Sequence, residues 1–152
     1  MSTLEQNKEI VRRIFNEFWL AGNTGVLDEL LAQDIVNHEL SKDPVARRGA
    51  YKAWATGFRQ VNATGLPDLD ITLDALVAEG DLVVKRWTSR GTHSGDYMGF
   101  PPSGKRVVMA GVTIYRIGAG QVRETWWNYD ALGLMQQLGA IPAPAERAAA
   151  RA

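Results

Sequence analysis

Residues 121–139, with the sequence QVRETWWNYDALGLMQQLG, carry the strongest structural signal in the chain. Their first half alternates polar and bulky residues and is rich in tryptophan, tyrosine and valine, a pattern typical of a half-buried strand. In the second half Leu132, Met135 and Leu138 recur at helical spacing. The pattern therefore predicts a strand that passes into a helix near Asp130. Because two indoles, an amide, a phenol and a carboxylate lie beside this junction, we expect a functional site there.

Three amphipathic helices are expected in the first half of the chain. Their apolar residues recur every three or four positions, and the first helix starts with Ser2 and Glu5 in the spacing of a capping box. The expected helices cover residues 2 to about 22, 24–31 and 51–61, with a short strand at 35–39 and a turn at Asp43-Pro44.

The second half of the chain changes from the helical period to a period of two at Asp68. Gly80-Asp81 is typical of a hairpin turn, and Gly118-Ala119-Gly120 makes a second one. The expected strands cover residues 68–74, 82–93, 107–117 and 121–129. Helices followed by an antiparallel meander indicate the α+β class, with a curved sheet closed by three N-terminal helices into a cone-shaped barrel. Such a cone encloses a pocket suited to small molecules.

The composition is that of a globular protein of one domain. The 152 residues are 45% hydrophobic and 22% charged, and we expect a single domain over residues 1–141 with a flexible Ala/Pro-rich tail over 142–152. Seventeen basic and seventeen acidic residues balance, which argues against nucleic-acid or membrane partners. The chain has no cysteine, no signal-peptide pattern and no convincing metal-ligand spacing, so we expect a cytoplasmic protein without a metal.

The order of elements and four short motifs resemble the SnoaL-like family of polyketide cyclases, in the nuclear-transport-factor-2-like superfamily. The motifs are GTH at 91–93, MGFPPSGK at 98–105, GQV at 120–122 and LGLMQQLG at 132–139. The resemblance covers roughly residues 5–140. It implies an α+β barrel that is often dimeric through its sheet. The founding enzymes close a polyketide ring by an intramolecular aldol reaction, with one aspartate as acid and base and without a metal or organic cofactor.

The resemblance transfers to this chain only in part. Asn37 and His93 match polar pocket positions of the cyclases, whereas the position of the catalytic aspartate falls on Trp127. Two further polar positions of the cyclases fall on Gly111 and Thr113. A tryptophan cannot take a proton from carbon, so the aldol mechanism would have to rest on another acid or be absent. The resemblance thus implies a pocket that is more aromatic and less acidic than that of a cyclase.

Some relatives in anthracycline pathways are hydroxylases that oxygenate a reduced polyketide ring without a metal or bound flavin. This chemistry needs an aromatic cavity for a flat ring system and polar groups that stabilise its anion. We therefore expect Asp130 and His93 as catalytic residues. The substrate-binding candidates are Asn37, His38, Arg86, Trp87, Met109, Thr113, Trp127 and Asn128.

Several of these residues also have a purely structural interpretation. Asp130 precedes a helix and is equally suited to cap it. His38 and His93 are candidates because histidine is the side chain best suited to proton transfer at neutral pH, but a lone histidine is more often structural. Along the 82–93 strand, Arg86 and Arg90 lie on one face, whereas Lys85, Trp87, Ser89 and His93 share the other. We expect one arginine of that strand to point inward, and either Trp126 or Trp127 to face the pocket.

The sequence thus favours a tailoring enzyme for anthracycline-type polyketides, with ring hydroxylation as the first hypothesis. The alternatives are a cyclase that closes a ring by intramolecular aldol condensation, and a small-molecule binding module without catalytic activity. No bound cofactor is expected, although hydroxylation would need dioxygen and an external NADPH-dependent reductase. The expected partners are a polycyclic aromatic substrate and a second copy of the chain in a homodimer.

Overall fold

The structure is a computed structural model that describes residues 3–39 and 47–144. Within these ranges the helices are α1 (Thr3–Arg13), the π-helix η1 (Ile14–Leu20), α2 (Gly25–Leu30), α3 (Arg47–Gly65) and α4 (Ala131–Gln137). The strands are β1 (Leu31–Asn37), β2 (Asp70–Glu79), β3 (Leu82–Thr92), β4 (Arg106–Gly118) and β5 (Gln121–Tyr129). Among the described residues, no helix combines the length and apolar character needed to cross a membrane.

The strands form one mixed sheet in the order β1-β5-β4-β3-β2. The predicted meander is confirmed, since β2, β3, β4 and β5 pair antiparallel with their neighbours. The short strand expected at 35–39 lies at 31–37 instead and pairs parallel with β5. Register shifts leave one extra residue in β2, between Leu73 and Ala75, and one in β5, between Val122 and Glu124, and such bulges bend a sheet.

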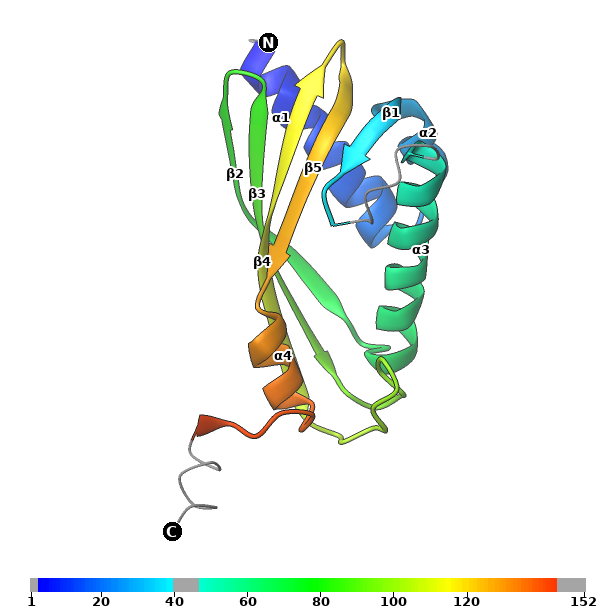
Figure 1. The fold of residues 1–152 in the computed structure, drawn as a ribbon, viewed down its shortest axis with the longest axis vertical. Helices are drawn as coiled ribbons and strands as arrows, with labels where there is room; N and C mark the ends of the chain where they lie inside the picture. Colours follow the sequence, from blue (N-terminus) through cyan, green and yellow to red (C-terminus); the bar gives the residue numbers. More distant parts are fainter. Residues whose placement is uncertain (1–2, 40–46, 145–152) are drawn as a thin grey trace.

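The helices cover one side of the curved sheet, as Figure 1 shows. Helix α1 packs against β2 and β3, and α3 packs against β1. The edge strands β1 and β2 do not pair with each other, and the helices close the space inside the curve of the sheet. Helix α4 follows β5 directly and packs against β4. This arrangement is the expected α+β cone, with its interior between α3, η1 and the concave face of the sheet.

Two clusters of buried side chains hold the cone together. The larger one joins the N-terminal helices and β1 to the sheet through residues such as Phe18, Leu27 and Tyr115, which are fully buried. The smaller cluster joins α4 and the C-terminal end of α3 to β3 and β4. It contains Leu66, Met109, Leu134 and four further buried side chains. Burying such side chains stabilises the fold by about 1.5–3 kcal/mol each. The space between the two clusters is the candidate site.

Three elements differ in detail from the sequence-based expectation. Residues 14–20 form a π-helix, and Leu31 begins β1 instead of ending α2. Helix α3 is longer than predicted, because it starts at Arg47 and continues to Gly65. The expected Ser2 cap, the Asp43-Pro44 turn and residues 145–152 of the expected tail lie outside the described residues.

Candidate functional site

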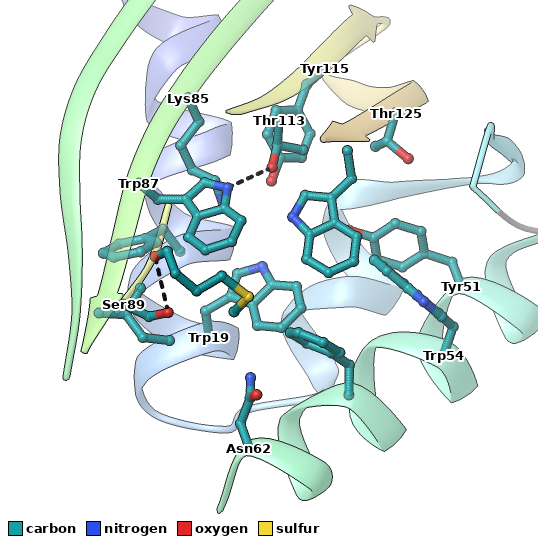
Figure 2. A pocket seen from close by; sticks show the side chains of 15 residues that line it. Trp19, Tyr51, Trp54, Asn62, Lys85, Trp87, Ser89, Thr113, Tyr115 and Thr125 are labelled. Carbon is teal, nitrogen blue, oxygen red and sulfur yellow. Dashed lines mark hydrogen bonds between the residues drawn. The ribbon is translucent and has the colours of Figure 1, made fainter. Parts of the chain in front are cut away.

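A cavity opens between the concave face of the sheet and helices η1 and α3 (Figure 2). It encloses about 530 Å³ of space, counting the part open to solvent. Eight of its fifteen lining residues are aromatic: Phe15, Trp19, Tyr51, Trp54, Phe58, Trp87, Tyr115 and Trp127. The polar lining residues are Asn62, Lys85, Ser89, Thr113 and Thr125. A flat aromatic ligand fits such walls, because it can stack on rings while its oxygen substituents meet a few polar groups.

Strand register explains why these side chains meet. Lys85 of β3 lies opposite Thr113 of β4, and Thr113 lies opposite Trp127 of β5. Tyr115 of β4 likewise lies opposite Thr125 of β5. Because side chains alternate between the faces of a strand, all five point to the concave face. One short region of three adjacent strands thus supplies the polar end of the cavity.

The aromatic walls are packed against one another. The Trp127 ring centroid lies 5.2 Å from that of Trp54 and 4.9 Å from that of Phe58, in edge contacts, and 6.1 Å from that of Trp87 in a stacked contact. Gly111 leaves room for this arrangement, because a Cβ atom there would lie 2.5 Å from Cζ2 of Trp87. The polar side chain that the family resemblance places at residue 111 is therefore replaced by the Trp87 indole. The sides of the cavity are rigid and apolar.

Lys85 is the ionisable group that distinguishes the cavity. Its side chain is almost completely buried, and it makes no hydrogen bond or ion pair with any residue the structure describes. Its Nζ lies 5.4, 5.8 and 5.5 Å from the ring centroids of Phe15, Trp19 and Tyr115. Burial lowers the pKa of Lys85 from 10.5 to about 7, because a desolvated ammonium is unfavourable. Near neutral pH this lysine can therefore give or take a proton.

Three buried polar atoms of the cavity lining lack hydrogen-bond partners. They are Nε1 of Trp19, Oη of Tyr115 and Oγ1 of Thr125. Figure 2 shows Lys85, Tyr115 and Thr125 toward one end of the cavity, with Asn62 at the other. Burial raises the pKa of Tyr115 well above its usual value, and the neighbouring Tyr51 raises it further, so its hydroxyl remains neutral. Unpaired buried donors are costly, and a ligand oxygen bound beside Lys85 would satisfy them.

Other polar groups of the lining already have partners inside the protein. The indole N–H of Trp87 donates to Oγ1 of Thr113 at 3.2 Å, and the hydroxyl of Ser89 donates to the backbone carbonyl of Met109 at 3.3 Å. Oδ1 of Asn62 accepts a hydrogen bond of 2.9 Å from the hydroxyl of Tyr97. These bonds fix side-chain orientations and leave the region around Lys85 as the place where a ligand oxygen finds free donors.

Four of the residues proposed from the sequence line the cavity. Trp87, Met109, Thr113 and Trp127 are brought together by β3, β4 and β5. The open question about the two tryptophans is answered by this arrangement, since Trp127 faces the cavity. Trp126 lies on the outer face, where it stacks on His38 with ring centroids 4.6 Å apart.

The remaining substrate-binding candidates lie away from the cavity. Arg86 has a side chain that is 62% exposed and pairs with Asp74, so the expectation of an inward arginine at this position is wrong. His38 bonds Glu124 on the outer face, and Asn128 is exposed. Asn37 ends β1, accepts a hydrogen bond from the Glu39 backbone N–H and does not line the cavity.

His93 is fully buried in a structural network. Its Nδ1 lies 3.0 Å from Oγ of Ser103, and its Nε2 lies 3.2 Å from the backbone carbonyl of Phe100. Because a carbonyl can only accept, Nε2 donates to the Phe100 oxygen. Both ring nitrogens therefore tie β3 to the loop that precedes β4, and neither reaches the cavity lining.

Asp130 is the N-cap of α4. Its Oδ1 accepts a hydrogen bond of 2.8 Å from the backbone N–H of Gly133, and its side chain is exposed outside the cavity. Gly133 is the residue that fits here, because a Cβ atom at this position would lie 2.2 Å from Oδ2 of Asp130. The strand-to-helix junction is thus confirmed, and its carboxylate holds the helix end.

Replacing Asp130 by alanine tests this assignment. We expect D130A to lower the free energy of unfolding by about 1 kcal/mol, because an N-cap hydrogen bond is lost. D130N should be nearly neutral, since asparagine caps as well as aspartate. Thermal unfolding measures both variants, and ligand affinity and turnover should match the wild type. A loss of turnover in D130N with unchanged stability would instead restore the acid/base hypothesis.

Lys85 and most of the helical part of the site are absent from the residues proposed from the sequence. The available signal for Lys85 is that it shares a strand face with Trp87, whereas the charged candidate proposed on this strand was Arg86 of the other face. Tyr51, Trp54 and Trp19 were interpreted as packing residues, because their spacing places them on apolar helix faces. They do pack, and they also form the cavity wall.

Comparison with known proteins identifies the family. The model of the SnoaL-like polyketide cyclase family matches residues 9–138, so the chain belongs to that family. A solved structure from Jannaschia sp. CCS1, assigned as a SnoaL-like polyketide cyclase, is 31% identical with a TM-score of 0.72, and the alignment covers 93% of this chain and 98% of that one. IdmH from Streptomyces antibioticus, assigned as a polyketide cyclase, is 29% identical with a TM-score of 0.71 and coverage of 88% and 99%.

A third structure is similar in fold. AclR from Streptomyces galilaeus, assigned as a hydroxylase, has a TM-score of 0.76 with 24% identity, and the alignment covers 98% of this chain and 92% of that one. At this identity the likeness concerns the fold alone. A search of curated proteins gives no significant match.

Proposed function

We propose that the protein hydroxylates a reduced ring of a polycyclic, anthracycline-type polyketide with dioxygen. Membership of the polyketide cyclase family supports a polyketide as the substrate class. The aromatic cavity supports a flat, fused-ring ligand, because stacked and edge contacts with rings favour planar aromatic surfaces.

Lys85 is the observation on which the proposed chemistry rests. Among the described residues that line the cavity there is no carboxylate, and the amine of Lys85 is the available base. A base whose pKa is about 7 is better matched to a phenolic O–H than to a carbon acid next to a ketone. The site therefore favours formation of a ring anion over the aldol step of the family's founding enzymes.

In the proposed reaction, Lys85 takes a proton from one hydroxyl of the dihydroquinone. The resulting ammonium faces the phenolate, and the hydroxyls of Tyr115 and Thr125 are available as further donors. The electron-rich ring carbon bonds to dioxygen, and Lys85 returns its proton to the peroxide. The O–O bond then breaks, the proton on the ring carbon and the terminal oxygen leave as water, and a hydroxylated quinone remains. One dihydroquinone and one dioxygen thus give one hydroxyquinone and one water.

The two electrons consumed by dioxygen come from the dihydroquinone. A separate NADPH-dependent quinone reductase would supply the reduced ring, as the family resemblance implies. The chain's own contribution is to bind the ring between aromatic walls, to hold the anion beside Lys85 and to exclude bulk water from the reacting carbon.

A product assay by mass spectrometry tests the proposal. The purified protein is mixed with an anthracyclinone, NADPH and a quinone reductase in air, and the controls omit the protein, the reductase or dioxygen. We expect a product that has gained one oxygen only in the complete mixture. A product with a newly closed ring but no added oxygen, from an open precursor, would establish the cyclase alternative. Binding without any product would establish the binding module.

We also propose that the chain forms a homodimer through the outer face of its sheet. Val84, Val112, Ile114 and Trp126 alternate with the cavity-lining positions and are only half-buried on this face. Light scattering coupled to size-exclusion chromatography should give twice the chain mass, and the mass of a single chain would contradict the dimer.

A further inference from the structure

Lys85 has the surroundings of a nucleophilic lysine. Its amine is at the wall of a cavity large enough for a ligand, and its nearest described neighbours are the rings of Phe15, Trp19 and Tyr115. We propose that Lys85 also reacts covalently with carbonyl ligands, forming an imine with an aryl ketone or aldehyde held between the aromatic walls. This reactivity goes beyond the proposed hydroxylation and does not rest on it.

The first requirement for this reaction is an uncharged amine. A neighbouring carboxylate favours the charged form of a lysine. Nζ of Lys52 lies 2.6 Å from Oδ2 of Asp28, and Nζ of Lys8 lies 2.8 Å from Oε1 of Glu5. Lys85 has no such partner among the described residues, and the burial that lowers its pKa leaves a large share of neutral amine near pH 7.

The titratable groups that share the cavity do not restore the charge. Tyr115 on β4 and Tyr51 on α3 are the other ionisable side chains of its lining. Burial raises the pKa of both phenols, with a smaller contribution from Glu39 in the case of Tyr51, so both are neutral at physiological pH. Helix η1 contributes only Phe15 and Trp19 to the lining. Ring faces attract the ammonium weakly, but they offer it no hydrogen bond.

The second requirement is a place for the carbonyl oxygen. The Nζ lone pair bonds to the carbonyl carbon, and the π electrons of the C=O bond move to its oxygen, which takes a proton from the amine. The oxygen then leaves as water with a second amine proton, and a C=N bond remains. Tyr115 and Thr125 are opposite residues on β4 and β5, and their buried hydroxyls have no hydrogen-bond partner in the structure. These hydroxyls are the groups available to hydrogen-bond the carbonyl oxygen before it leaves.

The ligand class follows from the cavity walls. An aryl ketone or aryl aldehyde stacks its ring on Trp87 and Trp127 while its carbonyl group reaches the polar end formed by Lys85, Tyr115 and Thr125. When the imine nitrogen takes a proton from solvent, the resulting iminium withdraws electrons from the neighbouring carbon, which is the activation that C–C bond formation needs. Lys85 thus offers this chain a route to carbonyl chemistry that uses an amine in place of a carboxylate.

Reductive trapping tests the proposal. The full chain at pH 7 is mixed with one equivalent of 2-naphthaldehyde, or with 2-acetylnaphthalene, and sodium cyanoborohydride, and adducts are located by intact mass and peptide mapping. We expect one adduct per chain, on Lys85, formed at least ten times faster than on any exposed lysine. K85M should lose this adduct, whereas K52M should keep it. Neither dioxygen nor the reductase is needed, so this result is independent of the hydroxylation assay.

The pH dependence supplies a second readout. The labelling rate of Lys85 should reach its maximum a little above pH 7, whereas ordinary exposed lysines require a pH near ~10. Peptide mapping of the wild-type protein gives this answer even if a variant folds poorly. Absence of an adduct on Lys85, or labelling spread evenly over exposed lysines and unchanged in K85M, would overturn the proposal.

Discussion

K85M is expected to lower kcat for ring hydroxylation by about 100-fold or more. The substitution removes the amine that takes the proton from the ring hydroxyl and then pairs with the resulting phenolate. The same substitution should increase the free energy of unfolding at pH 7 by about 1–4 kcal/mol, because methionine fills the site without an unpaired buried amine. Steady-state kinetics and denaturant unfolding measure the two effects. An exposed lysine outside the site would give neither effect, so the two together indicate a buried functional amine.

The stability gain should depend on pH in a specific direction. Between about pH 7 and 10.5 the unfolded chain binds a proton at Lys85 that the folded chain does not, so wild-type stability increases with pH across this window. The slope is at most about 1.4 kcal/mol per pH unit. The advantage of K85M should therefore be constant below pH 7, shrink above it and vanish near 10.5.

R86M is the matched control for K85M. Arg86 is the next residue of β3 and points to the outer face, where it pairs with Asp74 at 3.3 Å. Its removal should change stability by no more than about 1 kcal/mol, because exposed ion pairs contribute little. Turnover should be unchanged. Equal losses of turnover in K85M and R86M, or a K85M protein that is less stable than the wild type at pH 7, would contradict the assignment.

W127L is expected to weaken binding of a planar polyketide about 10- to 100-fold, which corresponds to about 1.4–2.7 kcal/mol. Trp127 lies at the centre of the aromatic wall, in contact with Trp54, Phe58 and Trp87. Leucine keeps an apolar side chain but removes the face on which a ligand ring stacks. Isothermal titration with an anthracyclinone gives the dissociation constant.

W126L is the control for this prediction. Trp126 is the adjacent residue on β5 but points outward, stacked on His38 and beneath the guanidinium of Arg116. Ligand affinity should therefore stay within a factor of two or so of the wild type. If W126L weakened binding as much as W127L, the effect would be one of general destabilisation and not of the cavity wall.

The fold could be predicted from the sequence because its strongest signals are local. Polar and apolar residues alternate along 82–93 and 107–117, which indicates strands. Short turns at Gly80-Asp81 and Gly118-Ala119-Gly120 then make consecutive strands antiparallel neighbours. The parallel pairing of β1 with β5 has no such signal. These strands are more than eighty residues apart in the chain, and only the packing of the helices brings them together.

The part of the site that lies on strands was predictable where the alternation of side chains shows which residues share a face. A period of two shows that Lys85 and Trp87 share a face, but it does not show which face is concave. The bend of the sheet toward α3 and η1 settles that question, and it places Arg86 outside. His93 could not be assigned from the sequence either, because its partners, Ser103 and the Phe100 carbonyl, come from a loop whose path the pattern does not define.

Asp130 illustrates the opposite case. The sequence correctly indicated a strand that ends where a helix begins, and an aspartate at that junction satisfied both a chemical and a structural hypothesis. The structural hypothesis is favoured by two observations: Asp130 accepts a hydrogen bond from Gly133, and it is not among the residues that line the cavity. The strongest fold signal of the chain therefore lies next to the site without supplying its ionisable group.

NMR titration of the lysine side chains would show whether Lys85 is the neutral amine of the cavity. The chain has five lysines, Lys8, Lys42, Lys52, Lys85 and Lys105, and K85M identifies the signal of Lys85 by its loss. We expect a midpoint near pH 7 for Lys85 in the free protein, and a midpoint at least one unit higher when a phenolic anthracyclinone is bound, because the phenolate stabilises the ammonium. A midpoint near ~10.4, unchanged by the ligand, would contradict it.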